Sequence, residues 1–498
     1  MTAETRIALI PLDERPVNTV LVEDVAAIAG ANLELPPADA LPSFRDPADV
    51  RALDDWALAM TDTADAFVVS VDTLVHGGLI PGRLLYDTPA EALQRLDVLR
   101  QLRARMGQSR RISAVSVVGR ASDSYVSFEE PSYWAQYGRD LHALGGNVHR
   151  AWRGMPSADT KIPHTIRDDF ARRRLRNHIV NAAALGLRWE RVIDILAITA
   201  DDTAQWSAGS AEQEIIDYWG RLGSLDGVLV HPGADETGAV LVARELAHAA
   251  RCVPLIDVRS GNDAEMDRIP LYENVPVRDS IERQIAAVGG ARAIDRADFV
   301  LLVHTPDPDS GDLVWTSPTA DAEAVAATTA AIERALETEL PVVVADLRYA
   351  NGGDQALVEE LARRGLLSKL AGYSAWNTAG NALGSALAFG VAIVAGQTTG
   401  SLDATAVARA RTRRILDDVG YQAHLRSQLV ESTFGGLGPV GEETASAATE
   451  AITEGLRRSW LPLADPMNAF WLGGIELPWR RSFEIDLRLE AAKPTPSA

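Results

Sequence analysis

Cysteine is almost absent from this chain of 498 residues, in which Cys252 is the only one. A single cysteine excludes an intrachain disulfide and a cluster of thiolate metal ligands. The segment around it, "RCVPLID", is typical of the start of a buried strand, which argues against a catalytic thiol. We therefore expect the chemistry of this protein to lie elsewhere.

Basic residues are also scarce, because 48 lysines and arginines face 69 acidic residues, for a net charge of −21. Such a charge argues against nucleic acid or an anionic membrane as the partner, and it favours solubility. The N-terminus lacks the features of a signal peptide, and the most apolar helical segment, 385–396, is too short to cross a bilayer. These absences predict a cytoplasmic protein with a small-molecule substrate, and they leave a homo-oligomer open.

Nucleotide-binding motifs and internal repeats are absent as well. The sequence contains neither a Gly-rich dinucleotide fingerprint nor a GxxxxGK phosphate loop. We therefore predict that no cofactor is required.

Apolar runs typical of buried strands alternate with helical patterns along the chain. Nine such runs occur, at 7–12, 66–71, 112–118, 192–198, 226–231, 253–258, 298–303, 341–345 and 370–375. Strands that alternate with helices indicate a parallel α/β fold, and eight of them would close a (β/α)8 TIM-like barrel over residues 1–398. The weakest run, 253–258, is then assigned to an insertion. An open doubly wound sheet, in two domains, is the competing topology.

Three regions lie outside the predicted barrel strands. Residues 123–186 form a long helical insertion after the third strand, and residues 399–490 are mainly helical. The last residues, 491–498, have the composition of a disordered tail.

Charged and amide residues follow six of the predicted strands, where α/β proteins place their sites. Any one of them could cap the next helix, and Glu236 and Asp354 have the best pattern for that role. Six strand ends with such residues exceed what capping requires, so we expect them to surround one substrate. The predicted substrate-binding residues are Asp13, Arg15, Asp72, His76, Arg83, Asp235, Glu236, Asp346, Asn351, Asp354, Trp376, Asn377 and Asn381.

The adjacent carboxylates Asp201 and Asp202 follow the fourth predicted strand and are the predicted catalytic residues. Two neighbouring carboxylates repel each other, so one of them should have a raised pKa and act as a general acid. The other would stay ionised and orient a substrate group.

Six motifs in order carry a family resemblance, namely "PLDERPVN", "SVDTLVHGGLIPGR", "ADDTAQWSAG", "GADETG", "YANGGD" and "WNTAGNALG". With them the chain resembles a bacterial family known only as a domain of unknown function, DUF4127, over most of residues 7–390. That resemblance implies no particular chemistry.

A fainter resemblance is to barrel glycosidases that remove β-N-acetylglucosamine by substrate-assisted catalysis. The pair Asp201–Asp202, the stretch "DLRYANGGD" and the loop "WNTAGN" occur in the same order as in those enzymes. By that resemblance Asp202 would protonate the leaving oxygen and Asp201 would hold the attacking acetamido group.

The sequence therefore favours a retaining glycoside hydrolase acting on an intracellular or imported small glycoside, with an N-acetylhexosaminide as the candidate substrate. One alternative is a metal-dependent hydrolase, because His76, His231 and His304 each follow a strand and could bind Zn²⁺ or Mn²⁺ together with Asp13, Asp72 or Asp235. The other alternative is a sugar-binding protein without catalysis. A bound metal is not part of the favoured hypothesis.

Overall fold

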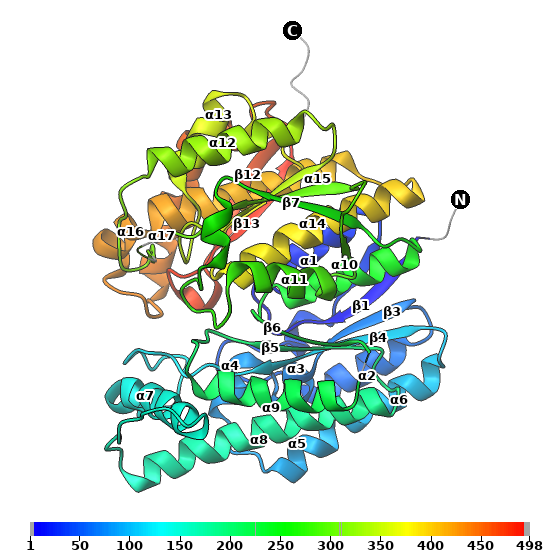
Figure 1. The fold of residues 1–498 in the computed structure, drawn as a ribbon, viewed down its shortest axis with the longest axis vertical. Coiled ribbons are helices and arrows are strands. Elements are labelled where there is room, and N and C mark those ends of the chain that lie inside the picture. Colours follow the sequence, from blue (N-terminus) through cyan, green and yellow to red (C-terminus); the bar gives the residue numbers. More distant parts are fainter. Residues whose placement is uncertain (1–3, 225, 308, 310, 493–498) are drawn as a thin grey trace.

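The computed structural model describes residues 4–224, 226–307, 309 and 311–492. Two open parallel sheets dominate the fold and lie one above the other in Figure 1. The first sheet has the strand order β2-β1-β3-β4-β5-β6. Its strands are β1 (Arg6–Ile10), β2 (Asn32–Glu34), β3 (Ala66–Ser70), β4 (Arg111–Val118), β5 (Ile195–Ala200) and β6 (Val228–Pro232).

The second sheet repeats this plan with the strand order β11-β10-β9-β7-β8. Its strands are β7 (Leu255–Ser260), β8 (Ala291–Arg292), β9 (Phe299–His304), β10 (Val342–Asp346) and β11 (Gly372–Ser374). Counted from its own first strand, each sheet begins 2-1-3-4-5, which is the flavodoxin-like doubly wound order. The chain therefore contains the same topology twice, although no repeat is visible in its sequence.

The expected single (β/α)8 barrel is wrong. All nine predicted strands are present, but they are divided between two sheets with free edges at β2, β6, β8 and β11. The run 253–258, which we assigned to an insertion, is β7, an inner strand of the second sheet. Apolar runs look alike in a barrel and in an open sheet because both bury the strands on two faces, so the pattern could not separate the two topologies.

Burial on both faces explains the continuous apolar strands. In β1, Ile7 and Leu9 point into a central core, whereas Ala8 and Ile10 point into the core on the outer face. In β9, Leu301 joins that same central core. Side chains alternate between the two faces of a strand. When both faces are buried, apolar residues are therefore favoured at successive positions.

The central core lies between the two sheets and is filled by helices α1 (Val20–Ile28), α10 (Thr237–Ala249), α11 (Val277–Ala287) and α14 (Ala379–Thr399). Helix α14 is longer than the 12-residue segment that the sequence suggested, and by length and composition alone it could cross a membrane. Its most apolar window is fully buried inside the protein, however, as expected of a core helix. The shared core joins the two halves into one body.

Other helices cover the outer faces of the sheets. In the first half, the helices that connect the strands are α2 (Val50–Met60), α3 (Val71–His76), α4 (Leu79–Leu84), α5 (Pro89–Arg95), α6 (Asp97–Met106), α7 (Trp134–Trp152), α8 (His164–Trp189) and α9 (Ala208–Leu222). The predicted insertion, 123–186, thus contains α7 and most of α8, and α8 packs against β4 and β5. In the second half, α12 (Ala322–Leu336) and α13 (Gln355–Arg363) have this position. Short 3₁₀ turns are η1 (Ala38–Ala40), η2 (Asp263–Asp267) and η3 (Leu367–Lys369).

The C-terminal region is mainly helical, as predicted. It comprises α15 (Ala404–Arg414), the π-helical η4 (Ile415–Leu425), α16 (Arg426–Leu429), η5 (Val430–Phe434), α17 (Glu442–Gly455), η6 (Leu456–Trp460) and α18 (Leu461–Ala464). Two antiparallel strands follow, β12 (Phe470–Glu476) and β13 (Asp486–Ala491), and the short turn η7 (Pro478–Arg480) lies in the loop between them. Apart from its first two residues, the predicted disordered tail, 491–498, lies outside the described residues.

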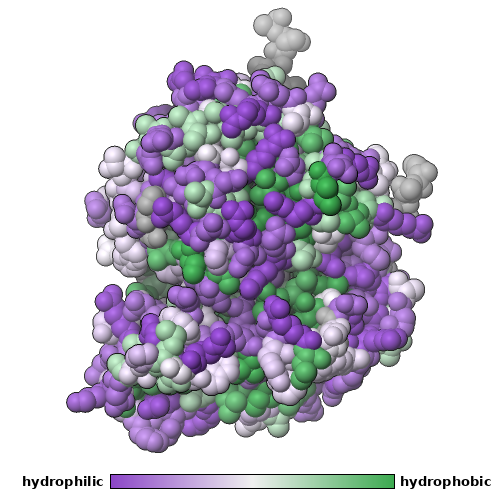
Figure 2. All heavy atoms as spheres, viewed as in Figure 1, coloured by the Kyte–Doolittle hydropathy of each residue, from purple (hydrophilic) through white to green (hydrophobic). Residues whose placement is uncertain are grey.

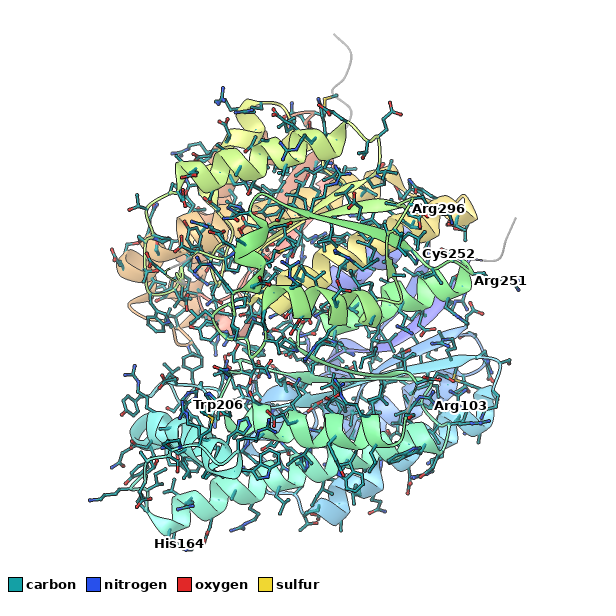
Figure 3. All side chains as sticks on the ribbon, viewed as in Figure 1. Arg103, His164, Trp206, Arg251, Cys252 and Arg296 are labelled. Carbon is teal, nitrogen blue, oxygen red and sulfur yellow. The ribbon has the colours of Figure 1, made fainter. Side chains whose placement is uncertain are left out.

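The visible surface is mainly polar, and the single cysteine lies away from the strand ends that carry the predicted site. Hydrophilic residues predominate on the face shown in Figure 2, and apolar ones lie in small separate patches. Cys252 precedes β7 and therefore lies at the amino edge of the second sheet, near Arg251 (Figure 3). Burial raises the pKa of its thiol, so the reactive thiolate is disfavoured there.

Candidate functional site

The richest collection of buried charges lies at the carboxyl edge of the first sheet, meaning the loops that follow β1, β3, β4, β5 and β6. Open α/β sheets bind ligands at this edge, next to the point where the strand order reverses. In the first sheet that point lies between β1 and β3. Nine predicted residues follow these strands, namely Asp13, Arg15, Asp72, His76, Arg83, Asp201, Asp202, Asp235 and Glu236.

Arg15 joins the loops after β1 and β6. Its guanidinium group donates to Asp13 at 2.7 Å and to Asp235 at 2.6 Å, and all three side chains are buried. Asn18 donates to Asp13 from the same loop at 2.8 Å. The motifs "LDERPVN" and "GADETG" therefore form one buried ion-pair cluster, although they are 220 residues apart.

The predicted catalytic pair is held by two arginines. Asp201 accepts from Arg83 at 2.6 Å, and Asp202 accepts from Arg120 at 2.7 Å. Asp202 has a left-handed backbone with φ of 35°, which is uncommon outside glycine. Its side chain remains 23% exposed, so a ligand can reach it.

Two glutamates from the loop after β4 complete this network. Glu129 accepts from Arg83 at 3.1 Å and from Arg120 at 2.7 Å, and Glu130 lies within 3.3 Å of both arginines. Sequence reasoning missed Arg120, which lies just before the predicted insertion. It missed Glu129 and Glu130 because the segment "YVSFEEPSYW" looked like the start of that insertion. The acidic pair beside aromatic residues was the signal that could have revealed them.

The C-terminal segment contributes a further pair of charges. Arg481, from the loop between β12 and β13, forms ion pairs with Glu129 and with Glu484, the latter at 2.9 Å. This loop, red in Figure 1, lies at the boundary between the two halves of the molecule. The site is therefore built from both ends of the chain, which no local motif could indicate.

Trp479 occupies an unusual position in that loop. Its ring lies 4.9 Å from the Arg15 guanidinium and 4.3 Å from that of Arg481, and its indole N–H donates to Glu14 at 2.5 Å. Trp479 has φ of 55°, which is a genuine outlier for a bulky residue. Backbone strain of this kind costs about 1–3 kcal/mol and persists where the surrounding contacts impose it.

Burial shifts several carboxyl groups toward their neutral form. Burial and the charge of Asp201 raise the pKa of Asp202, in spite of Arg120. Burial raises the pKa of Asp235 to about 6, against the opposing effect of Arg15. It also raises the pKa of Asp72, which accepts the Val117 N–H, to about 7.

Two more carboxyl groups with raised pKa values lie where the first sheet meets α14. Glu273 accepts the Gly380 N–H at 2.7 Å, and burial, reinforced by Glu236 and Asp202, raises its pKa to about 8. Burial likewise raises the pKa of Glu236 to about 7, although Gln284 donates to it at 2.9 Å. Glu236 makes no capping bond to α10, contrary to our expectation. Sequence reasoning missed Glu273 because it follows no predicted strand.

The carboxyl edge of the second sheet contains a separate group of predicted residues. Asp346 accepts from the Tyr373 hydroxyl and from the Asp354 N–H, each at 2.7 Å. Asp354 also contacts His304 at 3.2 Å and caps α13 through the Ala356 N–H, as its pattern predicted. These bonds fasten strands to helices, so the group has the character of a structural network.

The remaining predicted residues divide between the two edges. In the second half, the Asn351 side chain donates to Asp312 at 3.0 Å, and the Asn351 backbone N–H donates to the carbonyl of Asn377 at 2.7 Å. Trp376 is buried against Phe483 and offers no open face for a sugar. Asn381, in α14, accepts the Glu236 N–H at 3.4 Å and so belongs to the contact with the first sheet.

The three strand-end histidines do not assemble into a metal centre. His76 and His231 are buried, and burial lowers their pKa values to about 3 and about 4. His304 bonds to Thr328 and Asp354 in the other half. Among the described residues no three His, Cys, Asp or Glu side chains are grouped so that they could hold a metal ion. The proposed histidine ligand set is therefore not brought together.

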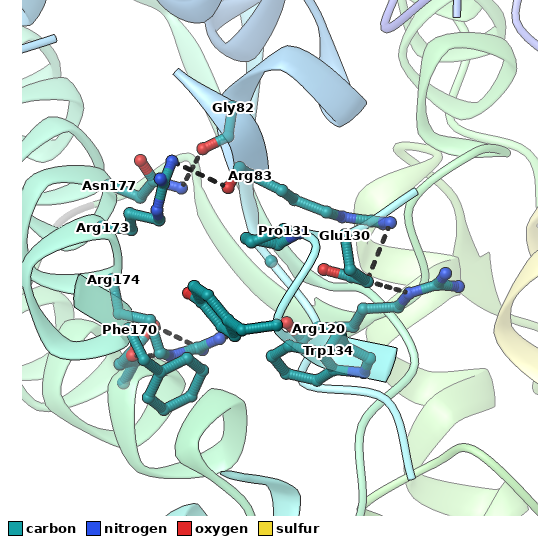
Figure 4. Close-up of a pocket in the computed structure, with 13 residues that line it drawn as sticks. Gly82, Arg83, Arg120, Glu130, Pro131, Trp134, Phe170, Arg173, Arg174 and Asn177 are labelled. Carbon is teal, nitrogen blue, oxygen red and sulfur yellow. Dashed lines mark hydrogen bonds and ion pairs between the residues drawn. The ribbon is translucent and has the colours of Figure 1, made fainter. Parts of the chain in front are cut away.

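A small cavity lies beside the two arginines that bind the predicted catalytic pair (Figure 4). It lies between the loop after β4 and helix α8, and it has a volume of about 40 Å³. Its lining includes Arg83 and Arg120, the arginines that hold Asp201 and Asp202.

Comparison with known families decides the relationship that the motifs suggested. Residues 7–488 match the family described as "Protein of unknown function (DUF4127)". The chain belongs to the DUF4127 family. Its family membership thus extends over both sheets and the C-terminal region, well beyond the residues 7–390 covered by the six motifs. No curated protein and no solved structure matches it significantly.

Proposed function

We propose that this DUF4127 protein is an acid–base hydrolase of small hydroxyl-rich molecules, with glycosides as the substrate class. The observation that supports it best is the pair Asp201–Asp202 at the carboxyl edge of the first sheet. One carboxylate is fixed by Arg83, and the other has a raised pKa and a partly exposed side chain. A glycosidase requires such a division between an ionised and a protonated carboxyl group.

In this proposal Asp202 donates its proton to the leaving oxygen of the glycosidic bond. Asp201, positioned by Arg83, orients the substrate on the other side. Asp13, Arg15 and Asp235 supply charged hydrogen-bonding groups for hydroxyls at the same edge. Carboxylates and guanidinium groups are strong partners for hydroxyls in a site that excludes water.

The earlier case for a substrate-assisted mechanism rested on a resemblance to barrel enzymes. This protein has two open sheets and no closed barrel in its described part, so it does not share the fold of those enzymes. The proposal therefore depends on the carboxyl pair and not on that resemblance. Cytoplasmic location, independence of cofactors and the lack of nucleic-acid or membrane partners remain predictions from the sequence.

Hydrolysis of a panel of nitrophenyl and alkyl glycosides, with and without a chelator, tests the proposal. Asp202→Asn should reduce turnover of alkyl glycosides far more than that of nitrophenyl glycosides, because a nitrophenolate leaves without protonation. Asp201→Asn should reduce both alike. Asp55→Asn is the matched control, since Asp54–Asp55 is another adjacent pair, on α2, and Asp55 is exposed.

Hydrolysis that disappears with the chelator and returns with Zn²⁺ or Mn²⁺ would instead support a metal-dependent hydrolase. Binding of sugars without any turnover would support the non-catalytic alternative.

A further inference from the structure

The outer face of helix α9 carries an apolar stripe that the rest of the described chain leaves partly open. Tyr218 and Leu222 in this stripe are 59% and 62% exposed, whereas the buried face of the same helix contains the polar side chains of Ser210 and Gln213. A helix at a protein surface normally has the reverse polarity. The members of the stripe follow one another at alternate spacings of three and four residues, the spacing with which one helix packs along another. They are Ala208, Ala211, Ile215, Tyr218 and Leu222.

Helices α7 and α8 form the walls of a groove along this stripe, at the end of the first half where the three helices lie together (Figure 1). Val148 of α7 and Leu175 of α8 line it, one from each wall, and are 54% and 60% exposed. The groove has a volume of about 360 Å³. Ile215 also lines a second hollow of about 580 Å³, beside Trp152 and Tyr218. Exposed apolar and aromatic residues gathered in this way mark an interaction surface.

Positive charge is concentrated around the groove. Residues 134–189, which contain α7 and α8, include ten basic residues but only four acidic ones, in a chain whose net charge is −21. Arg167 lines the groove and is exposed. Among the ion pairs that α7 and α8 form in the described chain, none involves Arg150, Arg167 or Arg172. These three side chains can therefore pair with carboxylates from a partner.

The carboxylates of this surface are already neutralised. Three of them line the groove and the second hollow, and each is paired with an arginine. The pairs are Glu212 with Arg174, Glu214 with Arg153 and Asp217 with Arg221. The charge left over at the groove is therefore positive.

These properties select one kind of occupant. A second copy that docked groove to groove would place like charges against one another. An anionic membrane is flat and is repelled by a chain with a net charge of −21. A groove between helices accommodates a helix, and its surplus positive charge favours carboxylates on that helix.

We infer that the groove between α7, α8 and α9 binds an acidic amphipathic helix of a partner protein. The apolar side chains of that helix pack along the α9 stripe, and its carboxylates pair with Arg150, Arg167 and Arg172. Because α9 has 15 residues and a helix rises about 1.5 Å per residue, the bound segment spans about four turns. This inference concerns a binding surface and does not depend on the proposed hydrolysis.

The test uses the full-length protein and two synthetic peptides of 15 residues, the length of α9. Both peptides carry leucine at alternate spacings of three and four residues and alanine elsewhere, and a side-chain lactam keeps them helical. They differ only at the positions that flank the leucines, which are glutamate in the acidic peptide and lysine in the basic one. Fluorescence anisotropy of the labelled peptides measures binding.

Wild type should bind the acidic peptide about tenfold or more tightly than the basic one, and added salt should weaken this binding. Leu175→Ser and Arg167→Gln should each weaken it about tenfold, as expected of residues central to an interface. The matched controls are Ile294→Ser, at an apolar position that is 93% exposed, and Arg51→Gln, at an exposed position of α2. Both controls should bind like wild type, and thermal melts establish that all four variants are folded.

Three results would overturn the inference. The first is no binding, or equal binding of the two peptides by wild type. The second is sedimentation of wild type, but not of Leu175→Ser, with phosphatidylglycerol vesicles, which would assign the surface to a membrane. The third is a wild-type dimer in analytical ultracentrifugation that Leu175→Ser dissociates, which would assign it to a second copy of the chain.

Discussion

The two sheets share one strand order and both end in carboxylates, yet their carboxyl edges are organised differently. At the first sheet, charged groups from five loops and from the C-terminal segment form ion pairs around a partly exposed Asp202 and a small cavity. At the second sheet, Asp346 is enclosed by Tyr373 and Asp354 in bonds that fasten the fold. The difference shows that polar residues at a strand end mark a place where a site can form, and that access and partners decide whether one does.

The largest expected effect is a difference in turnover between variants at the two carboxyl edges. Asp202→Asn should lower turnover of alkyl glycosides by about 10²–10⁴-fold, the usual contribution of a general acid. Asp346→Asn, the same change at the second edge, should leave turnover within threefold of wild type. Rates measured under saturating substrate check this comparison, and equal losses in both variants would show that the second edge also belongs to the active site.

The next effect concerns the C-terminal segment. Arg481→Met should lower the free energy of unfolding by about 3–5 kcal/mol, because Glu484 would remain buried without a partner and Glu129 would lose one of its three arginines. Arg488→Met is the control, since its pair with Glu476 is exposed and should contribute at most about 1 kcal/mol. Denaturant unfolding measures both. A loss for Arg481→Met no larger than that of the control would mean that the segment is not fastened to the first sheet by this pair.

A smaller effect depends on pH. Glu273 has a folded pKa of about 8, above its unfolded value of 4.5, so the folded protein keeps a proton that the unfolded chain releases between these values. Raising the pH through that range therefore stabilises the unfolded state and destabilises the wild type. Glu273→Gln cannot ionise, so its stability relative to wild type should increase by up to about 1.4 kcal/mol per pH unit from pH 5 to 8.

Thermal melts of both proteins across this pH range provide the measurement. Glu450→Gln, at an exposed position of α17, is the control and should follow the wild type. A pH-independent difference between Glu273→Gln and wild type would show that Glu273 is ionised in the folded protein.

The smallest effect is a loss of stability without a loss of function. Tyr373→Phe removes the hydroxyl that donates to Asp346, which should cost about 1–2 kcal/mol. Hydrolysis and sugar binding should be unchanged, since this network lies at the second edge. Reduced turnover in a correctly folded Tyr373→Phe protein would contradict a purely structural role.

The strands were the most predictable part of this protein. Runs such as 7–10 and 299–303 are apolar at every position because helices cover both faces, and this signal is local. The arrangement of those strands was not predictable in the same way, since the hydrogen-bonded neighbours of β1 are chosen by long-range pairing. The closed barrel was wrong for that reason, and the run at 253–258 was misplaced with it.

The sequence by itself determined nine of the strands, the family, the helical C-terminal region and the catalytic pair as a candidate. Tertiary structure alone decided which polar residues meet. It joined Arg15 to Asp235 across 220 residues and placed Arg481 on Glu129 across 352, and it moved Asp346 and His304 into a separate network. The physical reason is that burial and ion pairing depend on neighbours brought together by the packing of two sheets on a shared core, whereas an apolar strand is specified by its own residues.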